Sequence, residues 1–251
     1  MRNNLFCTLT AVLVAFMGVS CLNTSGLDMQ QGDHIDVATI VDGSYNTPYY
    51  VEFDNGEKAS VASNRVGSSI TFPTKPEILK GEVRKIVEYY LDGTPLEGFE
   101  KSITITNMFN IPTDIVKLLD TVNATEFDDP MNITAAGYAK NRNYLTMQLL
   151  LYKSAVLDYK HEFFLAYNPS KKGAYEDMYG SAEGDARYYL WFELYHDAGV
   201  DTTVSDLSET FLSVKLDPEV IGTDDLSNFK GIKIIYRDLD TRKPKIHTIN
   251  F

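Results

Sequence analysis

The residue in this chain with the most distinctive chemistry is Cys21, because the sequence before it has the form of a lipoprotein export signal. A single positive charge at Arg2 precedes an apolar run that ends in small residues, the last of them Ser20. The run is too short to cross a bilayer as a helix, and this order of charge, apolar segment and small residues is typical of an export signal. We therefore predict that residues 1–20 are a lipoprotein signal peptide, cleaved after the Cys21 sulfur has been joined as a thioether to a diacylglyceryl group with acyl chains such as palmitate.

One position departs from the usual lipoprotein pattern. Gly18 stands where an aliphatic residue is normal, so an ordinary secretory signal that leaves a cysteine nearby stays open as an alternative. The only other cysteine, Cys7, leaves with the signal, and an acylated Cys21 is a thioether. The mature chain should then hold no free thiol, which excludes disulfides, thiolate zinc sites and a cysteine nucleophile.

The net charge and residues 21–33 indicate which partners and which location to expect. The formal net charge is -12, and loss of Arg2 with the signal brings it to about -13. An acidic surface repels phosphate backbones, so we expect no nucleic-acid partner. Residues 21–33 are polar without hydrophobic period and predict a flexible tether. We expect a cell-envelope protein held at the outer membrane by the lipid on Cys21, on a face that the sequence leaves undecided.

The first half of the mature chain alternates apolar and polar residues with a period of two, as β-strands do. The segment 49–53 is followed by Asp54-Asn55-Gly56. Asn-Gly suits a type I′ turn, so residues 58–63 should return antiparallel. Further strands are expected over 81–91 and 99–108. Four or five strands in about 75 residues favour a small OB-like barrel, which we assign to residues 34–112.

The second half, residues 113–251, is again rich in β patterns. Thr113 can cap a helical turn over residues 115–119. Strands are then predicted over 144–152, 163–167, 188–196, 210–216, 232–237 and 244–251. Short strands with loop punctuation indicate an antiparallel β-sandwich, so the fold class is all-β.

Several strand and turn motifs together resemble a known family. They are VATIVDG (37–43), YYVEFDNG (49–56), KGEVRKIVEYYL (80–91), ITNMFNIPT (105–113), NYLTMQLLLY (143–152) and YYLWFELYHDAGVD (188–201). With the lipobox cysteine and tether, they look like the NigD-like lipoproteins of gut and oral anaerobic Gram-negative bacteria, over residues 33–251. The resemblance implies an OB-like barrel followed by a β-sandwich. It also implies an envelope lipoprotein associated by name with bacteriocin gene clusters, with no established catalysis and no active-site residues to transfer.

A search for catalytic and metal-binding patterns finds none that is complete. The chain has no glycine-rich phosphate loop, nucleophile elbow or Cys-x-x-Cys. His161-Glu162 lacks the second histidine of a zinc helix and falls in a strand pattern. Loop acids that could ligate calcium lack the spacing of a calcium loop; they are Asp128, Asp129, Asp224, Asp225, Asp238 and Asp240. We expect no catalytic residue, metal or cofactor.

Aromatic residues crowd the segment 188–196. An exposed face of Tyr189, Trp191 and Tyr195 would be a stacking platform for a sugar ring or a protein partner. The alternative is that the single tryptophan packs in the sandwich core. The exposure of Trp191 distinguishes the two.

Two classes of function follow. The first is a noncatalytic envelope lipoprotein that binds a protein or peptide of unknown identity, with a protective role associated with bacteriocin immunity. The second is a glycan-binding or glycan-hydrolysing surface lipoprotein, which needs a cleft with aromatics and paired carboxylates. Calcium-stabilised adhesion is a third possibility.

Overall fold

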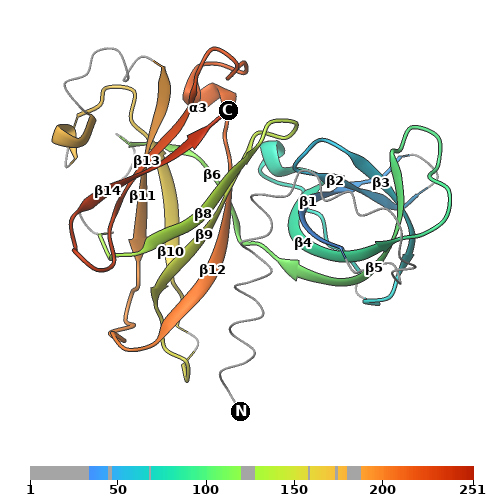
Figure 1. Cartoon of the computed structure of the whole chain (residues 1–251), viewed down its shortest axis with the longest axis horizontal. Helices are drawn as coiled ribbons and strands as arrows, with labels where there is room; N and C mark the ends of the chain where they lie inside the picture. Colours follow the sequence, from blue (N-terminus) through green and yellow to red (C-terminus); the bar gives the residue numbers. More distant parts are fainter. Residues whose placement is uncertain are drawn as a thin grey trace, which may run out of the picture.

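A β-barrel and a β-sandwich lie side by side in the computed structural model of the chain (Figure 1). The structure describes residues 34–44, 47–67, 69–119, 128–157, 159–172, 175–179 and 188–251. The predicted signal peptide, the tether and Cys21 lie outside the described residues. No helix in the described part of the chain has the length and apolarity that crossing a bilayer requires.

The barrel consists of five strands that close on themselves in the order β1-β2-β3-β5-β4. Their bounds are β1 (His34–Asp42), β2 (Tyr49–Phe53), β3 (Lys58–Asn64), β4 (Glu82–Leu91) and β5 (Lys101–Asn110). A short 3-10 turn, η2 (Glu77–Leu79), precedes β4. The predicted hairpin is present, since β2 and β3 pair antiparallel on either side of Gly56, which has a φ of 91°. Among the described strands of the barrel, only β3 and β5 pair parallel.

Strand alternation fills the barrel from one face of each strand. The barrel core includes Ala38 and Ile40 from β1, Val51 from β2, and Ile103 and Ile105 from β5, all fully buried. The other face of β1 carries an apolar alternation of its own, and it is covered by the sandwich. Both faces of β1 are therefore used.

The sandwich is built from two sheets, one in the order β14-β13-β11-β10-β7 and one in the order β6-β12-β9-β8. The strands are β6 (Thr113–Ile115), β7 (Lys117–Leu118), β8 (Asn132–Ala139), β9 (Tyr144–Tyr152), β10 (Glu162–Tyr167), β11 (Tyr189–Asp197), β12 (Leu207–Lys215), β13 (Gly231–Arg237) and β14 (Pro244–Asn250), with the short helices η5 (Glu176–Tyr179) and α3 (Pro218–Ile221). The all-β class is confirmed. The sheets are mixed rather than purely antiparallel, because β7, β6 and β13 pair parallel with β10, β12 and β11.

Two local predictions in the second half were wrong or incomplete. The helical turn expected over residues 115–119 does not form: β6 pairs with β12 in one sheet and β7 pairs with β10 in the other. Ladder pairing with these long strands outweighs the capping signal of Thr113, whose hydroxyl donates to the Ile111 carbonyl. Strand β8 was missed because its alanine and glycine content lowers β-propensity.

The sandwich core lies between the two sheets. Alternate residues of β9 point into it, namely Leu145, Met147, Leu149 and Leu151, each at most 1% exposed. A second apolar cluster covers the outer face of the five-stranded sheet, where β10 and β11 pack beneath η5. Strand β11 is therefore buried on both faces, and the remaining face of the four-stranded sheet is the one turned to the barrel.

Candidate functional site

The surface of the sandwich that meets the barrel is formed by the outward residues of β9 and β12. Thr146 pairs with Ser213 and Gln148 with Phe211 in the antiparallel register of the two strands. Directly opposed residues of a ladder share a face, and the alternate positions point into the sandwich core. Alternation thus places a mixed polar and aromatic face opposite β1 and β4.

Arg84 of β4 is buried at the centre of this contact, with its side chain inaccessible to solvent. Its Nη1 and Nη2 donate to Oδ1 and Oδ2 of Asp54 at 2.6 and 2.8 Å. The remaining N–H groups donate to hydroxyl oxygens at 2.8–3.1 Å, those of Thr39, Thr146 and Ser213. All five donors of the guanidinium are used, and the acceptors come from both the barrel and the sandwich.

A second ionic network lies beside the first. Arg142, after β8, donates to Glu52 at 2.6 Å and to Glu82 at 2.8 Å. Lys215 of β12 and the hydroxyl of Tyr144 also donate to Glu82, at 2.9 and 3.0 Å. Burial alone would lower the pKa of Arg142, but the hydrogen bond to Glu52 and the charges of Glu52 and Glu82 together outweigh burial and raise the pKa above its usual range. The barrel and sandwich are joined by two satisfied polar networks.

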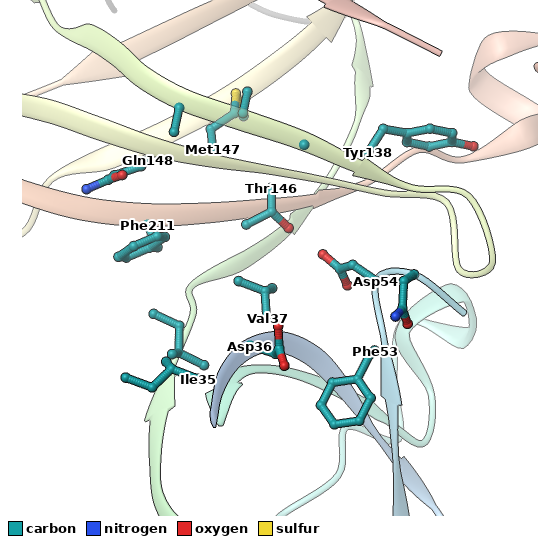
Figure 2. A pocket seen from close by; sticks show the side chains of 15 residues that line it. Ile35, Asp36, Val37, Phe53, Asp54, Tyr138, Thr146, Met147, Gln148 and Phe211 are labelled. Carbon is teal, nitrogen blue, oxygen red and sulfur yellow. The ribbon is translucent and has the colours of Figure 1, made fainter. Parts of the chain in front are cut away.

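A cleft of about 320 Å³ opens beside Arg84, between the barrel and the sandwich (Figure 2). Ile35, Val37 and Asp54 face Thr146, Gln148 and Phe211 across it. β8 contributes Ala135, Ala136, Gly137 and Tyr138. The volume lies at the lower end of the roughly 300–1,000 Å³ typical of ligand sites. The cleft is therefore the candidate binding site.

Two carboxylates line the cleft, in different states. Both oxygens of Asp54 accept from Arg84. Asp36 accepts from the hydroxyl of Tyr89 at 2.8 Å, and it has no ion pair among the described residues. Burial raises the pKa of Asp36, and the Tyr89 hydrogen bond opposes this only in part. Asp36 is thus the carboxylate of the cleft whose charge lacks a partner.

The aromatic face considered from the sequence does not form a platform. Trp191 and Tyr195 are each only 3% exposed, because η5 and its neighbours pack over the outer face of the sheet. Trp191 is therefore buried, although in the second cluster on the outer face of the sheet and not in the sandwich core between the sheets. Tyr189 is half-buried; its ring lies under the Lys233 ammonium, and its hydroxyl donates to Asn250 at 3.2 Å.

Glu193 is a fully buried carboxylate that sequence reasoning passed over. It accepts from Nδ2 of Asn168 at 2.9 Å and from the hydroxyls of Tyr179 and Tyr195. Burial raises the pKa of both phenols, and the hydrogen bonds to Glu193 raise them further. The sequence feature that could have indicated a buried carboxylate is a single acidic residue in the middle of an otherwise apolar strand. These hydrogen bonds hold η5 against the outer face of the five-stranded sheet.

Two of the four histidines of the chain meet near one end of the sandwich. Nδ1 of His161 lies 2.8 Å from Nε2 of His196, and Nε2 of His161 lies 3.1 Å from Asp201. Burial, and to a smaller extent His161, lowers the pKa of His196 to about 4. Hydrogen bonding with Thr203 holds the pKa of Asp201 below its usual range. These contacts connect the start of β10 and the end of β11 to the loop after β11.

Several of the loop acids considered for calcium bind groups of the chain itself. Asp129 accepts from the backbone N–H of Ala198, and Asp225 from that of Ser227. Asp238 accepts from Thr241 and pairs with Lys245. Across the described ranges no group of three or more histidine, aspartate or glutamate side chains is placed to hold a metal ion.

Comparison with known proteins gives the fold. No family model and no curated protein sequence matches the chain. Among solved structures, a protein of unknown function from Bacteroides vulgatus shares 19% identity and a TM-score of 0.64, covering 88% of this chain and 91% of its own. A NigD-like immunity protein from Bacteroides caccae shares 21% identity and a TM-score of 0.57, covering 85% and 91%. A candidate lipoprotein from Bacteroides fragilis shares 13% identity and a TM-score of 0.53, covering 88% and 98%.

At these identities the likeness establishes the fold alone. The resemblance noted in the sequence is confirmed at that level: this chain has the fold of a NigD-like immunity protein along most of its length.

The Arg84 network predicts a large stability effect. Arg84→Met leaves the Asp54 carboxylate without its cation, so we expect a loss of about 3–5 kcal/mol in the free energy of unfolding, measured by urea denaturation. The exposed Arg65, stacked on Tyr90, supplies the control Arg65→Met, with a loss within about 1 kcal/mol. Arg84→Met combined with Asp54→Leu should recover part of the stability. A single-variant loss below about 1 kcal/mol would contradict the role of Arg84.

His196 predicts a pH dependence. The unfolded chain takes up a proton near the ordinary value of 6.5, whereas the folded chain does so only near 4. The stability contributed by neutral His196 is thus fully present above 6.5 and is lost as the pH falls toward 4, by up to about 1.4 kcal/mol per pH unit. His196→Gln should flatten the slope of unfolding free energy between pH 4 and 6.5. His247, whose pKa burial also lowers, is present in both proteins. Parallel slopes for the two proteins would refute the assignment.

Proposed function

We propose that this protein is a noncatalytic lipoprotein of the cell envelope that binds a protein or peptide in the cleft between its barrel and its sandwich. The observation that carries the proposal is the cleft itself, whose walls come from both halves of the chain and are held together by Arg84. A cleft fixed by a saturated network is preorganised, so a partner does not have to order it.

The location rests on two supports. The first is the export signal before Cys21, which predicts a lipid anchor in the envelope and, in a Gram-negative cell, at the outer membrane. The second is the fold, which is shared with a candidate lipoprotein and with a NigD-like immunity protein. By analogy with the latter, the partner is a polypeptide against which the cell is protected.

Glycan hydrolysis is less well supported by the geometry. That chemistry uses two carboxyl groups free to act on the sugar and on water. In the cleft both oxygens of Asp54 are occupied by Arg84. Aromatic stacking is also unsupported at β11, because Trp191 and Tyr195 are buried. These observations favour a binding role over a hydrolytic one.

Lipid attachment is tested by metabolic labelling with an alkyne analogue of palmitate in a Gram-negative host. The full chain should incorporate the label and appear in the outer-membrane fraction. Cys21→Ser should abolish labelling and release the chain from the membrane. Equal labelling of the two chains would show that Cys21 is not the anchor.

Partner binding is tested by capture from envelope extract, with a variant that fills the cleft. A Cβ at Gly137 would meet no atom within 4 Å, so Gly137→Leu adds a side chain to the cleft without a steric clash at its first atom. The matched control is Ala62→Leu at an exposed position of β3. We expect a specific partner to be retained by the Cys21→Ser chain and by the control, and lost with Gly137→Leu. Identical capture by all three would refute the cleft as the binding site.

A further inference from the structure

We propose that the cleft accepts a lysine or arginine side chain, flanked by apolar residues, from an extended segment of the polypeptide partner, and that Asp36 is its ion partner. The inference rests on the proposed function and names the chemistry of the ligand. It follows from the charge of the cleft, from its walls and from the edge strand beside it.

The charge argument begins with what the cleft lacks. None of the described residues that line it is a lysine, arginine or histidine. Arg84 lies just behind the wall, but its side chain is inaccessible and its donors are all engaged. An anionic ligand would therefore find no available cation, and would face a chain with a net charge of -12. Charge complementarity selects a cationic ligand.

Asp36 is placed to receive that cation. Tyr89 donates to Oδ2 of Asp36, and Asp36 is one of the residues that line the cleft. The ring of Tyr89 is held against Phe53 and His34, with centroids 5.1 and 5.2 Å away. The charge of Lys101 favours the ionised form of Asp36, but the Lys101 ammonium is paired with Glu57 at 2.6 Å. The carboxylate is therefore oriented by its neighbours while it forms no ion pair with any described residue.

The walls suit the rest of such a ligand. Ile35 and Val37 from β1 and Phe211 from β12 give apolar surface on both sides of the cleft. Lysine and arginine bury their methylene stems against apolar surface while the charged end seeks a polar partner. The same walls would cover apolar residues next to the cation. A small free amine has no such residues and would leave the walls uncovered.

Strand β8 favours an extended segment. It is the last strand of its sheet, and its residues in the cleft include Ala135 and Gly137. Small side chains at an edge let a second backbone come close, as in the addition of a peptide strand to a sheet. The cleft is thus shaped for a length of chain rather than for a compact ligand.

The experiment titrates the chain from residue 21, with Cys21→Ser, against three peptides and follows amide chemical shifts by NMR. The peptides are acetyl-Leu-Lys-Leu-amide and the same sequence with norleucine or glutamate in the centre. We expect the lysine peptide to bind at least about tenfold more tightly than the norleucine peptide, and the glutamate peptide most weakly.

Four variants assign the effect. Asp36→Asn keeps an oxygen that can accept from Tyr89 but removes the charge, so it should make the lysine and norleucine peptides equal. Asp92→Asn is the matched control, because Asp92 is a barrel carboxylate outside the cleft that also accepts from a hydroxyl, that of Thr104; it should leave the preference intact. Gly137→Leu should weaken every peptide, and Ala62→Leu none.

Equal binding of the lysine and norleucine peptides, tighter binding of the glutamate peptide, or no binding of any peptide overturns the inference. If a partner is still captured in a manner sensitive to Gly137→Leu, the proposed function stands and only the ligand chemistry is wrong. If the lysine preference is found and depends on Asp36, but no partner is captured, the ligand chemistry stands and the proposed function fails.

Discussion

The buried guanidinium of Arg84 is the interaction on which the arrangement of this protein depends. Removing a charged group from water costs several kcal/mol even after relaxation, and the cost is offset only when the charge is paired and its donors are satisfied. Arg84 meets both conditions, with Asp54 and three hydroxyl groups as acceptors. Because those acceptors are divided between barrel and sandwich, a shift of either half would strand a buried donor. The network therefore fixes the relative position of the two halves, which an apolar contact would specify less sharply.

The same network forms part of the candidate site. Asp54 and Thr146, which accept from Arg84, also line the cleft. Their side chains cannot turn toward a ligand without breaking those bonds, so they act as a fixed wall. The chemistry left for recognition is that of Asp36 and the apolar residues around it. Arg84 thus shapes the cleft while contributing no available charge to it.

Much of the fold could be predicted from sequence because alternation and turn chemistry are local. Residues 144–152 were predicted as a strand, which forms, and Asn55-Gly56 marked a hairpin that also forms. The failures are positions where distant pairing decides. Residues 113–118 become strands because β12 and β10 lie beside them. Arg84 has the appearance of an ordinary polar residue in β4, since its partner Ser213 is 129 positions away and nothing local announces that contact.

The use of the basic residues connects stability with recognition. Arg84, Arg142 and Lys215 are each paired with carboxylates where barrel and sandwich meet. These cations are paired inside the molecule, so none of the three is available to a ligand in the cleft. Because the cleft walls come from both halves, a ligand that touches both binds only the assembled form. By linkage, binding of such a ligand must stabilise the contact between barrel and sandwich that Arg84 maintains. A substitution that weakens this contact must then lower the affinity for the ligand, although Arg84 does not touch the ligand.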